Sequence, residues 1–137
     1  MACQPSGFRE KEHTADWELE VWSPDLPGLL EEAARGMYWL MGARLEEGIR
    51  LQRNIEFYGV DNESRLVRFL QELLYLCDSQ NVGFDQVEIT IDGQRGRAEL
   101  SGAPLAHLGK EIKAVTYHNL AVRETSRGLE ATLVFDV

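Results

Sequence analysis

Two acidic segments, one near each end of the chain, carry the residue types from which a cation site could be built. His13-Thr14-Ala15-Asp16 precedes a strand-like run, and the sequence given stops on Val134-Phe135-Asp136-Val137. If the two end strands lie near each other, the carboxylates of Asp16, Asp136 and the Val137 terminus converge, and they then need a cation or a basic partner. Hard oxygen ligands of this kind favour calcium, magnesium or manganese over zinc.

Ordinary structural roles explain the same residues. Asp16 could cap a helix or turn, and Asp136 could lie in a solvated tail. A lone histidine at a strand edge, such as His13, is usually a structural hydrogen-bonding residue. Residue pattern alone favours these roles over a cation site.

A second candidate is the segment 110–118, which mixes Lys, His, Tyr and Thr densely within an acidic chain. Lys113, Thr116 and His118 could donate hydrogen bonds to an anion or to a partner. A solvated strand face explains them without function, and pattern alone favours that interpretation.

Composition and motifs exclude several classes of function. The chain of 137 residues has a formal net charge of -9, which argues against direct non-specific binding to nucleic acid. The charge fits a basic protein partner or a cation, and it also fits simple solubility. The sequence contains no GxSxG elbow, no Walker-type glycine-rich loop and no HExxH motif, so no catalytic set is evident.

Cysteine usage and hydropathy predict a cytoplasmic protein without a membrane span. No apolar run approaches the ~20 residues that cross a bilayer, and the N-terminus lacks the pattern of a signal peptide. Cys3 and Cys77 form no CxxC pair, which argues against a disulfide framework and makes the reducing cytoplasm the default compartment. We expect Cys77 to be a small buried hydrophobic residue on a helix.

Hydrophobic periodicity predicts the elements that must position these residues. Apolar residues at three- and four-residue spacing predict one helix that begins at Ser23 to Asp25 and ends near Gly42, and a second that begins at Asp61. Period-two alternation predicts strands over residues 7–12, 16–22, 49–60, 82–91, 97–101, 112–124 and 129–137, with a loop over 104–109.

These elements predict an α+β fold. Two amphipathic helices and many antiparallel strands are most simply buried as a two-layer sandwich, with both helices packed on one face of a mostly antiparallel multi-stranded sheet. No linker or repeat divides the chain, so residues 1–137 are expected to form a single domain, with residues 1–6 as a flexible tail.

Several motifs resemble the archease family, in family order and over essentially the whole chain. At the position after KAVTYH, often glycine in the family, the sequence has Asn119, which tolerates the same left-handed backbone. The matching segments are His13-Thr14-Ala15-Asp16, Ala33-Ala34-Arg35-Gly36-Met37, Leu70-Gln71-Glu72-Leu73-Leu74-Tyr75-Leu76, Glu111-Ile112-Lys113-Ala114-Val115-Thr116-Tyr117-His118-Asn119-Leu120 and Phe135-Asp136-Val137.

The resemblance implies an accessory protein and not an enzyme. Archeases assist the RtcB-type RNA ligase in tRNA splicing and RNA repair, by promoting ligase guanylylation and multiple turnover. The family also binds a divalent cation, calcium in crystals, with magnesium or manganese as alternatives. Carried over by motif, the metal ligands are Asp16, Asp136 and Val137, while His13, Lys113, Thr116 and His118 lie near the partner or the nucleotide.

Alternatives to this expectation stay open. An older proposal for the family is a general chaperone or modulator of RNA- or tRNA-modifying enzymes, and a small metal-dependent hydrolase is a more distant one. The net charge implies that tRNA is contacted only indirectly, through the ligase. An exposed edge strand could support a homo-oligomer.

Overall fold

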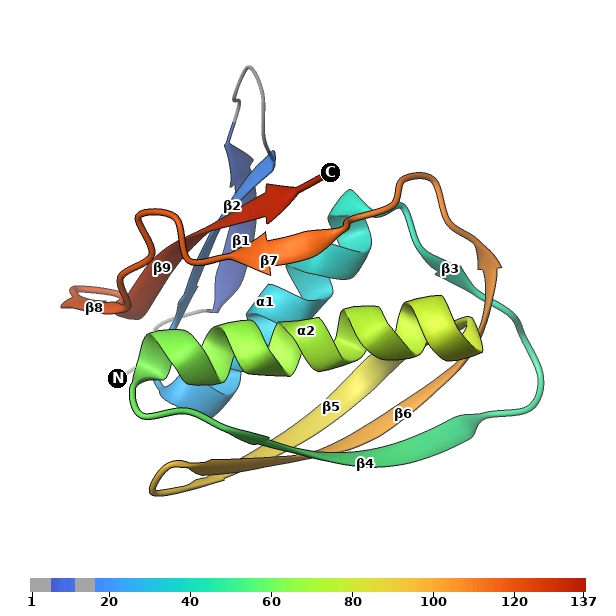
Figure 1. Ribbon diagram of the computed structural model, residues 1–137, viewed down its shortest axis with the longest axis horizontal. Coiled ribbons are helices and arrows are strands. Elements are labelled where there is room, and N and C mark those ends of the chain that lie inside the picture. The colour runs from blue at the N-terminus through green and yellow to red at the C-terminus, as the bar shows by residue number, and fades with distance from the viewer. Residues whose placement is uncertain (1–5, 12–16) are drawn as a thin grey trace.

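Two helices lie at the centre of the computed structural model, which describes residues 6–11 and 17–137 (Figure 1). Helix α1 (Leu26–Leu40) is capped by Asp25, whose carboxylate accepts the backbone N–H of Gly28 at 2.8 Å. Helix α2 (Asn62–Gln80) begins with a reciprocal capping box, in which Asp61 and Ser64 each accept the other's backbone N–H. It ends at Asn81, which adopts the left-handed conformation (φ 57°). Both predicted helices are therefore confirmed.

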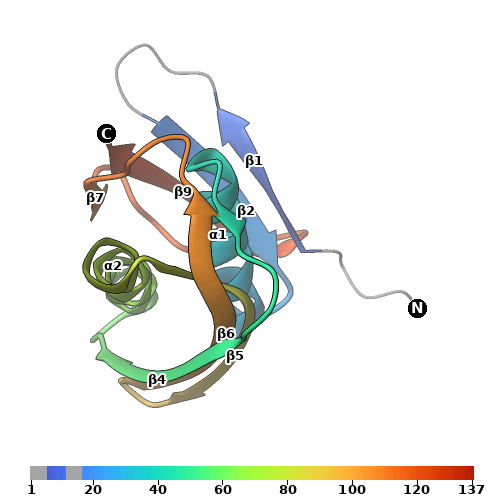
Figure 2. The same cartoon turned by 90° about the vertical axis from the view of Figure 1, so that its right-hand side faces the viewer.

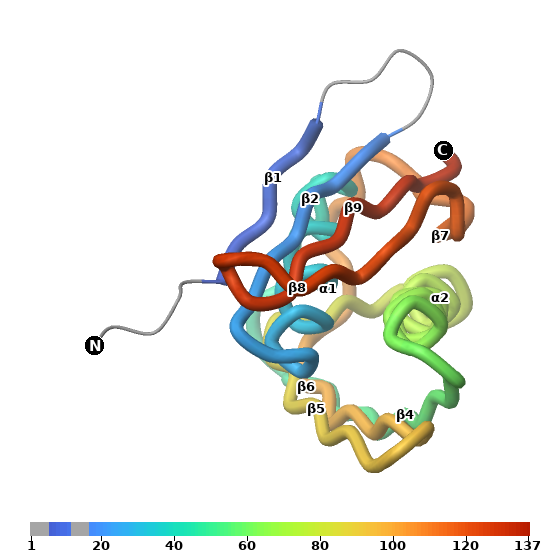
Figure 3. Tube along the Cα trace, turned by 90° about the vertical axis from the view of Figure 1, so that its left-hand side faces the viewer, coloured from blue at the N-terminus to red at the C-terminus, as the bar shows by residue number. Residues whose placement is uncertain are grey.

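The first sheet contains both end strands of the chain. Its order is β1 (Gly7–Lys11), β2 (Trp17–Ser23), β9 (Gly128–Asp136) and β7 (Ala114–Thr116), and β8 (Arg123–Thr125) also pairs with β9. All described pairs are antiparallel. Figure 3 shows β1, β2, β9 and β7 side by side in this order. Because β2 pairs along one edge of β9, β7 and β8 share the other edge.

The second sheet is built on the long strand β6 (Arg95–His107). Strands β4 (Leu51–Tyr58), β5 (Val82–Asp92) and the two-residue β3 (Arg44–Leu45) all pair with β6 in the antiparallel sense. A bulge shifts the β5–β6 register between Phe84 and Gln86. The sheet therefore bends where β5 begins.

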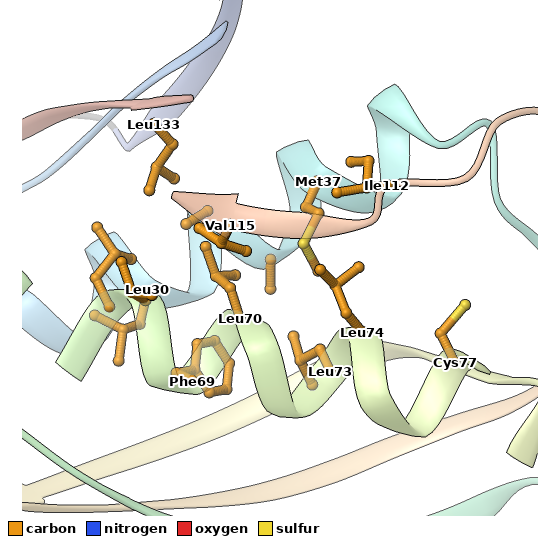
Figure 4. Close-up of a cluster of buried hydrophobic side chains, with 14 of the residues drawn as sticks. Leu30, Met37, Phe69, Leu70, Leu73, Leu74, Cys77, Ile112, Val115 and Leu133 are labelled. Atoms are coloured by element: carbon orange, nitrogen blue, oxygen red, sulfur yellow. The ribbon is translucent and has the colours of Figure 1, made fainter. Parts of the chain in front are cut away.

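The core lies between the two sheets and around both helices. Helix α1 contacts β1, β2 and β9 on one side and β5 on the other, while α2 contacts β7 on one side and β4, β5 and β6 on the other (Figure 2). Figure 4 shows side chains of α1, α2, β7 and β9 meeting in this layer. The largest fully buried side chains include Phe69, Phe135, Leu19, Leu29, Leu30, Met37, Leu70, Leu73 and Leu133.

Gly36 brings α1 close to the first sheet. A Cβ atom at this position would lie 2.6 Å from Cδ2 of Leu19 and 2.9 Å from the ring of Phe8. The absence of a side chain at Gly36 therefore allows α1 to pack closely against the β1–β2 hairpin.

The α+β class, with two amphipathic helices and mostly antiparallel strands, is confirmed. The division of the strands into two sheets, one on each side of the helices, is a feature that the periodicity does not predict. Two local expectations are wrong. The predicted loop over 104–109 is strand as far as His107, because Leu105 and His107 pair with β3. The predicted strand over 112–124 is reduced to β7 and β8.

Neither helix within the described residues is long and apolar enough to cross a membrane. Cys77 is buried on α2, as expected. Burial, reinforced by the nearby carboxylates of Asp78 and Glu111, raises the pKa of its thiol.

Candidate functional site

The pairing of β2 with β9 brings the predicted terminal segments to the same end of one sheet. Trp17 lies opposite Phe135, and this is the last described pair at that end. In the sequence, Trp17 follows Asp16 and Phe135 precedes Asp136. The two end strands therefore lie side by side, whereas His13 and Asp16 themselves fall outside the described residues.

Asp136 lies at the end of β9 with its side chain exposed. Its carbonyl oxygen accepts the backbone N–H of Lys113 at 2.8 Å, and Ala114 is its partner on β7. In the part of the chain that the structure describes, no side chain pairs with its carboxylate. Val137 is half-buried and packs against the core. The strand end is thus fixed by its backbone, and the Asp136 carboxylate remains accessible.

A divalent cation fits the chemistry of this donor set, because carboxylate oxygens are the ligands that calcium, magnesium and manganese prefer. Within residues 6–11 and 17–137, no three His, Cys, Asp or Glu side chains gather closely enough to hold a metal ion. Asp136 would therefore need ligands from outside that set of side chains, such as Asp16 or the α-carboxylate of Val137.

The segment singled out by its mixed polar residues lies along β9. The Thr116 hydroxyl donates to the carbonyl oxygen of Val134 at 2.9 Å and accepts the backbone N–H of His118 at 3.3 Å. This hydroxyl therefore holds the backbone as β7 ends. Lys113 and His118 are exposed, and the His118 Nε2 lies 3.3 Å from the Asn119 side-chain amide. Lys113 is adjacent to Asp136, while His118 lies further along the sheet.

A groove of about 460 Å³ runs over the outer face of the first sheet. It contains the side chains of His118 and Asn119, together with charged and polar residues of the neighbouring strands. The other lining residues are Lys11, Glu18, Glu20, Ala121, Arg123, Thr125, Glu130, Ala131, Thr132 and Val134. This face is not covered by either helix, so the groove is open to a partner.

Arginine side chains organise the charges at one end of the groove. Arg127 donates to Glu130 (2.9 Å) and to Glu20 (3.1 Å), and Glu20 also pairs with Arg9 at 3.0 Å. Hydrogen bonds from Thr125 and Arg127 hold the pKa of Glu130 below its usual value. These glutamates are therefore paired carboxylates, in contrast to Asp136.

Three features of this region escape sequence analysis. Lys110 places its Nζ 4.3 Å from the centre of the Trp17 ring, next to the end of β9. Tyr117 has an exposed fraction of 53% and lines a different groove from His118. The carboxylate of Glu63 accepts the backbone N–H of Val122 at 2.7 Å. Only the fold brings Lys110 to Trp17 and Val122 to Glu63, because the two residues of each pair are far apart in the sequence.

Asn119 has a φ of 52°, in the left-handed region. Asn tolerates this conformation, as does glycine, which is often found at this position in the family that the motifs resemble. Asn119 lies in a tight turn after β7, in which the backbone N–H of Leu120 donates to the carbonyl oxygen of Tyr117 at 3.0 Å. The chain then continues into β8 in the same direction along β9.

Comparisons with known proteins agree with the motifs. Residues 8–137 match the model of the Archease protein family (MTH1598/TM1083). Proteins named "Protein archease" include one from Archaeoglobus fulgidus, 35% identical over 95% of this chain and 98% of its own, and one from Pyrococcus furiosus, 30% identical over 85% and 88%.

Solved structures share the fold. The solution structure of Methanobacterium thermoautotrophicum protein 1598 aligns with a TM-score of 0.71 and 24% identity, over 96% of this chain and 99% of that one. The crystal structure of an archease from Thermotoga maritima, described as a "possible chaperone", aligns with a TM-score of 0.70 and 24% identity, over 94% and 96%. With a family match over nearly the whole sequence and relatives at 30% identity or more, the chain belongs to the archease family.

Proposed function

We propose that this protein is an activator of an RtcB-type RNA ligase, which promotes ligase guanylylation and multiple turnover without being an enzyme itself. Family membership supports the proposal. The observation that carries it is the pairing of Trp17 with Phe135, since these residues adjoin Asp16 and Asp136 in the sequence. An accessible carboxylate at such a strand end suits an acidic tip that approaches a partner's phosphate-binding site.

Asp16, Asp136 and the α-carboxylate of Val137 would hold a divalent cation, with calcium, magnesium or manganese as candidates. When bound, the cation would supply positive charge that neutralises these carboxylates and attracts phosphate oxygens. The backbone of Lys113 adjoins Asp136 in the sheet, and the exposed side chain of Lys113 would add a second cationic contact with the partner. His118 and the groove beside it would contact the ligase or the nucleotide.

The charge of the chain supports a protein partner over direct contact with RNA. A formal charge of -9 repels a polyanion at long range and attracts a basic surface. The ligase would therefore carry the RNA, and this protein would act on the ligase.

A multiple-turnover ligation assay with a cognate ligase tests the proposal. The wild-type protein should increase the number of ligations per ligase, and the Asp136→Asn variant should lose most of that stimulation. Glu88→Gln is the matched control, because Glu88 is an exposed carboxylate on β5 of the other sheet. Full stimulation by Asp136→Asn would contradict the role of the acidic tip, and no stimulation by the wild-type protein would reject the proposed function.

Calorimetric titration with calcium tests the cation site separately from the ligase. Asp136→Asn should weaken binding, and so should a short extension after Val137 if the α-carboxylate is a ligand. Unchanged calcium affinity in the extended variant would remove Val137 from the ligand set.

A second candidate is a general chaperone or modulator of RNA- or tRNA-modifying enzymes. It is favoured by the description of the Thermotoga maritima archease as a "possible chaperone". A chaperone would suppress the aggregation of unrelated unfolded enzymes, and Asp136→Asn would retain that activity. An activator of one ligase would leave such aggregation unchanged.

A further inference from the structure

We infer that Glu63 is a positioning residue, which fixes the segment 117–122 and thereby presents His118 to the partner. The inference rests on the proposed function for its biological meaning, but its structural part can be tested without a ligase. The sequence around His118 does not predict that a residue of α2 holds this segment in place.

The segment 117–122 leaves the sheet between two short strands. Strand β7 ends at Thr116 and β8 begins at Arg123, and both pair with the same edge of β9. Residues 131–133 of β9 have no strand partner on that edge within the described chain. The backbone of 117–122 therefore lacks the ladder of hydrogen bonds that would otherwise hold it.

A few hydrogen bonds replace that ladder. Those at the start of the segment are local: His118 bonds to the Thr116 hydroxyl, and Leu120 bonds to Tyr117. At the other end, the backbone N–H of Val122 donates to the Glu63 carboxylate at 2.7 Å. Of the hydrogen bonds found in the described chain, this is the one that ties the segment to a helix.

Glu63 is well suited to act as an anchor. It lies in the first turn of α2, where the Asp61–Ser64 capping box fixes the backbone. Both Glu63 and Val122 are half-buried, and Val122 also packs against the core. A carboxylate that accepts a partly buried amide makes a charge-assisted hydrogen bond, which is stronger than a neutral one.

The segment matters because it serves two grooves at once. His118 lines the groove on the outer face of the first sheet. Tyr117 lines a second groove of about 430 Å³, together with Tyr58, Arg68 and Glu72 and other residues of β4 and α2. A shift of the segment would displace two adjacent exposed side chains that face different surfaces. Fixing Val122 therefore fixes both.

Amide hydrogen exchange followed by NMR tests the anchor directly. In Glu63→Ala, the Val122 amide should exchange roughly 10-fold faster or more, since its charged acceptor is lost. Glu63→Gln keeps an acceptor oxygen and should restore most of the protection. In Glu63→Ala, the exchange rates of amides in the middle of α2 should stay at their wild-type values. In the control variant Glu88→Gln, all amide exchange rates should do so. Unaltered Val122 protection in Glu63→Ala would overturn the inference, whatever the ligase assay gives.

The ligation assay then tests the functional part. The concentration of Glu63→Ala that gives half-maximal stimulation should be about fivefold or more above that of the wild-type protein, with the same maximum. The reason is that a loose segment lowers the fraction of molecules in the conformation that binds the ligase. Glu63→Gln should rescue this concentration dependence. If Val122 loosens but stimulation keeps its wild-type concentration dependence, the segment is not part of the interface. If the wild-type protein gives no stimulation, the proposed function fails, and the exchange experiment still decides the anchor.

Discussion

Replacement of Gly102 by alanine tests the close packing of β5 on β6. A Cβ atom at Gly102 would lie 1.8 Å from the carbonyl oxygen of Gly83 and 2.7 Å from the Cα of Phe84. Both atoms belong to the backbone of β5, so no side-chain rotation can relieve the overlap. The φ of Gly102 lies outside the left-handed region, which means that alanine is excluded by space alone.

The overlap forces β5 and β6 apart by more than ~1 Å next to the bulge. Backbone hydrogen bonds at this point contribute about 1 kcal/mol each, and Phe84, which is buried, loses part of its packing. Together with overpacking strain, the free energy of unfolding should fall by about 3 kcal/mol or more. That is a large share of the ~5–15 kcal/mol that stabilises a typical domain.

Urea denaturation of Gly102→Ala measures this change. Gly93→Ala is the control, because its Cβ would meet nothing within 4 Å, and only the positive φ of 62° costs free energy there, about 1 kcal/mol. If Gly102→Ala is no less stable than the control, β5 and β6 are not in the close contact that the structure describes.

Three further predictions concern two titrating groups, Cys77 and Asp85. In a Cys3→Ser background, Cys77 should react with iodoacetamide more slowly in the folded protein than in urea, because burial raises its thiol pKa; equal rates would contradict this. Because the thiol pKa is higher in the folded protein than in the unfolded chain, Cys77 stabilises the fold fully below the unfolded thiol pKa of about 9. The free energy of unfolding should therefore fall as the pH rises above that value, and denaturation at several pH values measures the fall. The Arg50 hydrogen bond lowers the pKa of Asp85, so Arg50→Ala should raise that pKa in an NMR titration, and an unchanged value would remove Arg50 as the cause.

Local signals allowed much of the fold to be predicted. Asp25 and Asp61 are the N-caps of the two helices, at the positions where the sequence predicts each helix to begin. The alternation along 129–137 matches the burial of β9. These features depend on neighbours within a few residues, which is the range over which sequence patterns act.

Features that depend on distant partners could not be predicted. Pro104 suggests a loop, yet it pairs with Val82 on β5, which precedes it by more than twenty residues. The alternation after Ile112 fits a longer strand, but the left-handed Asn119 turns the chain away from β9. The contact between Glu63 and Val122 spans 59 positions and leaves no local pattern. Candidate residues such as Lys113 and His118 can be identified from their residue types. The residues that surround them in space can be identified only from the structure.

The central place of β9 in the first sheet has a consequence for how the protein is made. Strand β9 pairs with β2, β7 and β8, and it is the last element of the described chain to be synthesised. On the ribosome, the β1–β2 hairpin must therefore wait for almost the entire chain before its neighbour arrives. Long-range pairing of this kind slows folding. The sheet that carries the proposed cation site therefore cannot be completed before its central strand has been synthesised, and a nascent chain cannot display a completed acidic tip before synthesis reaches Asp136.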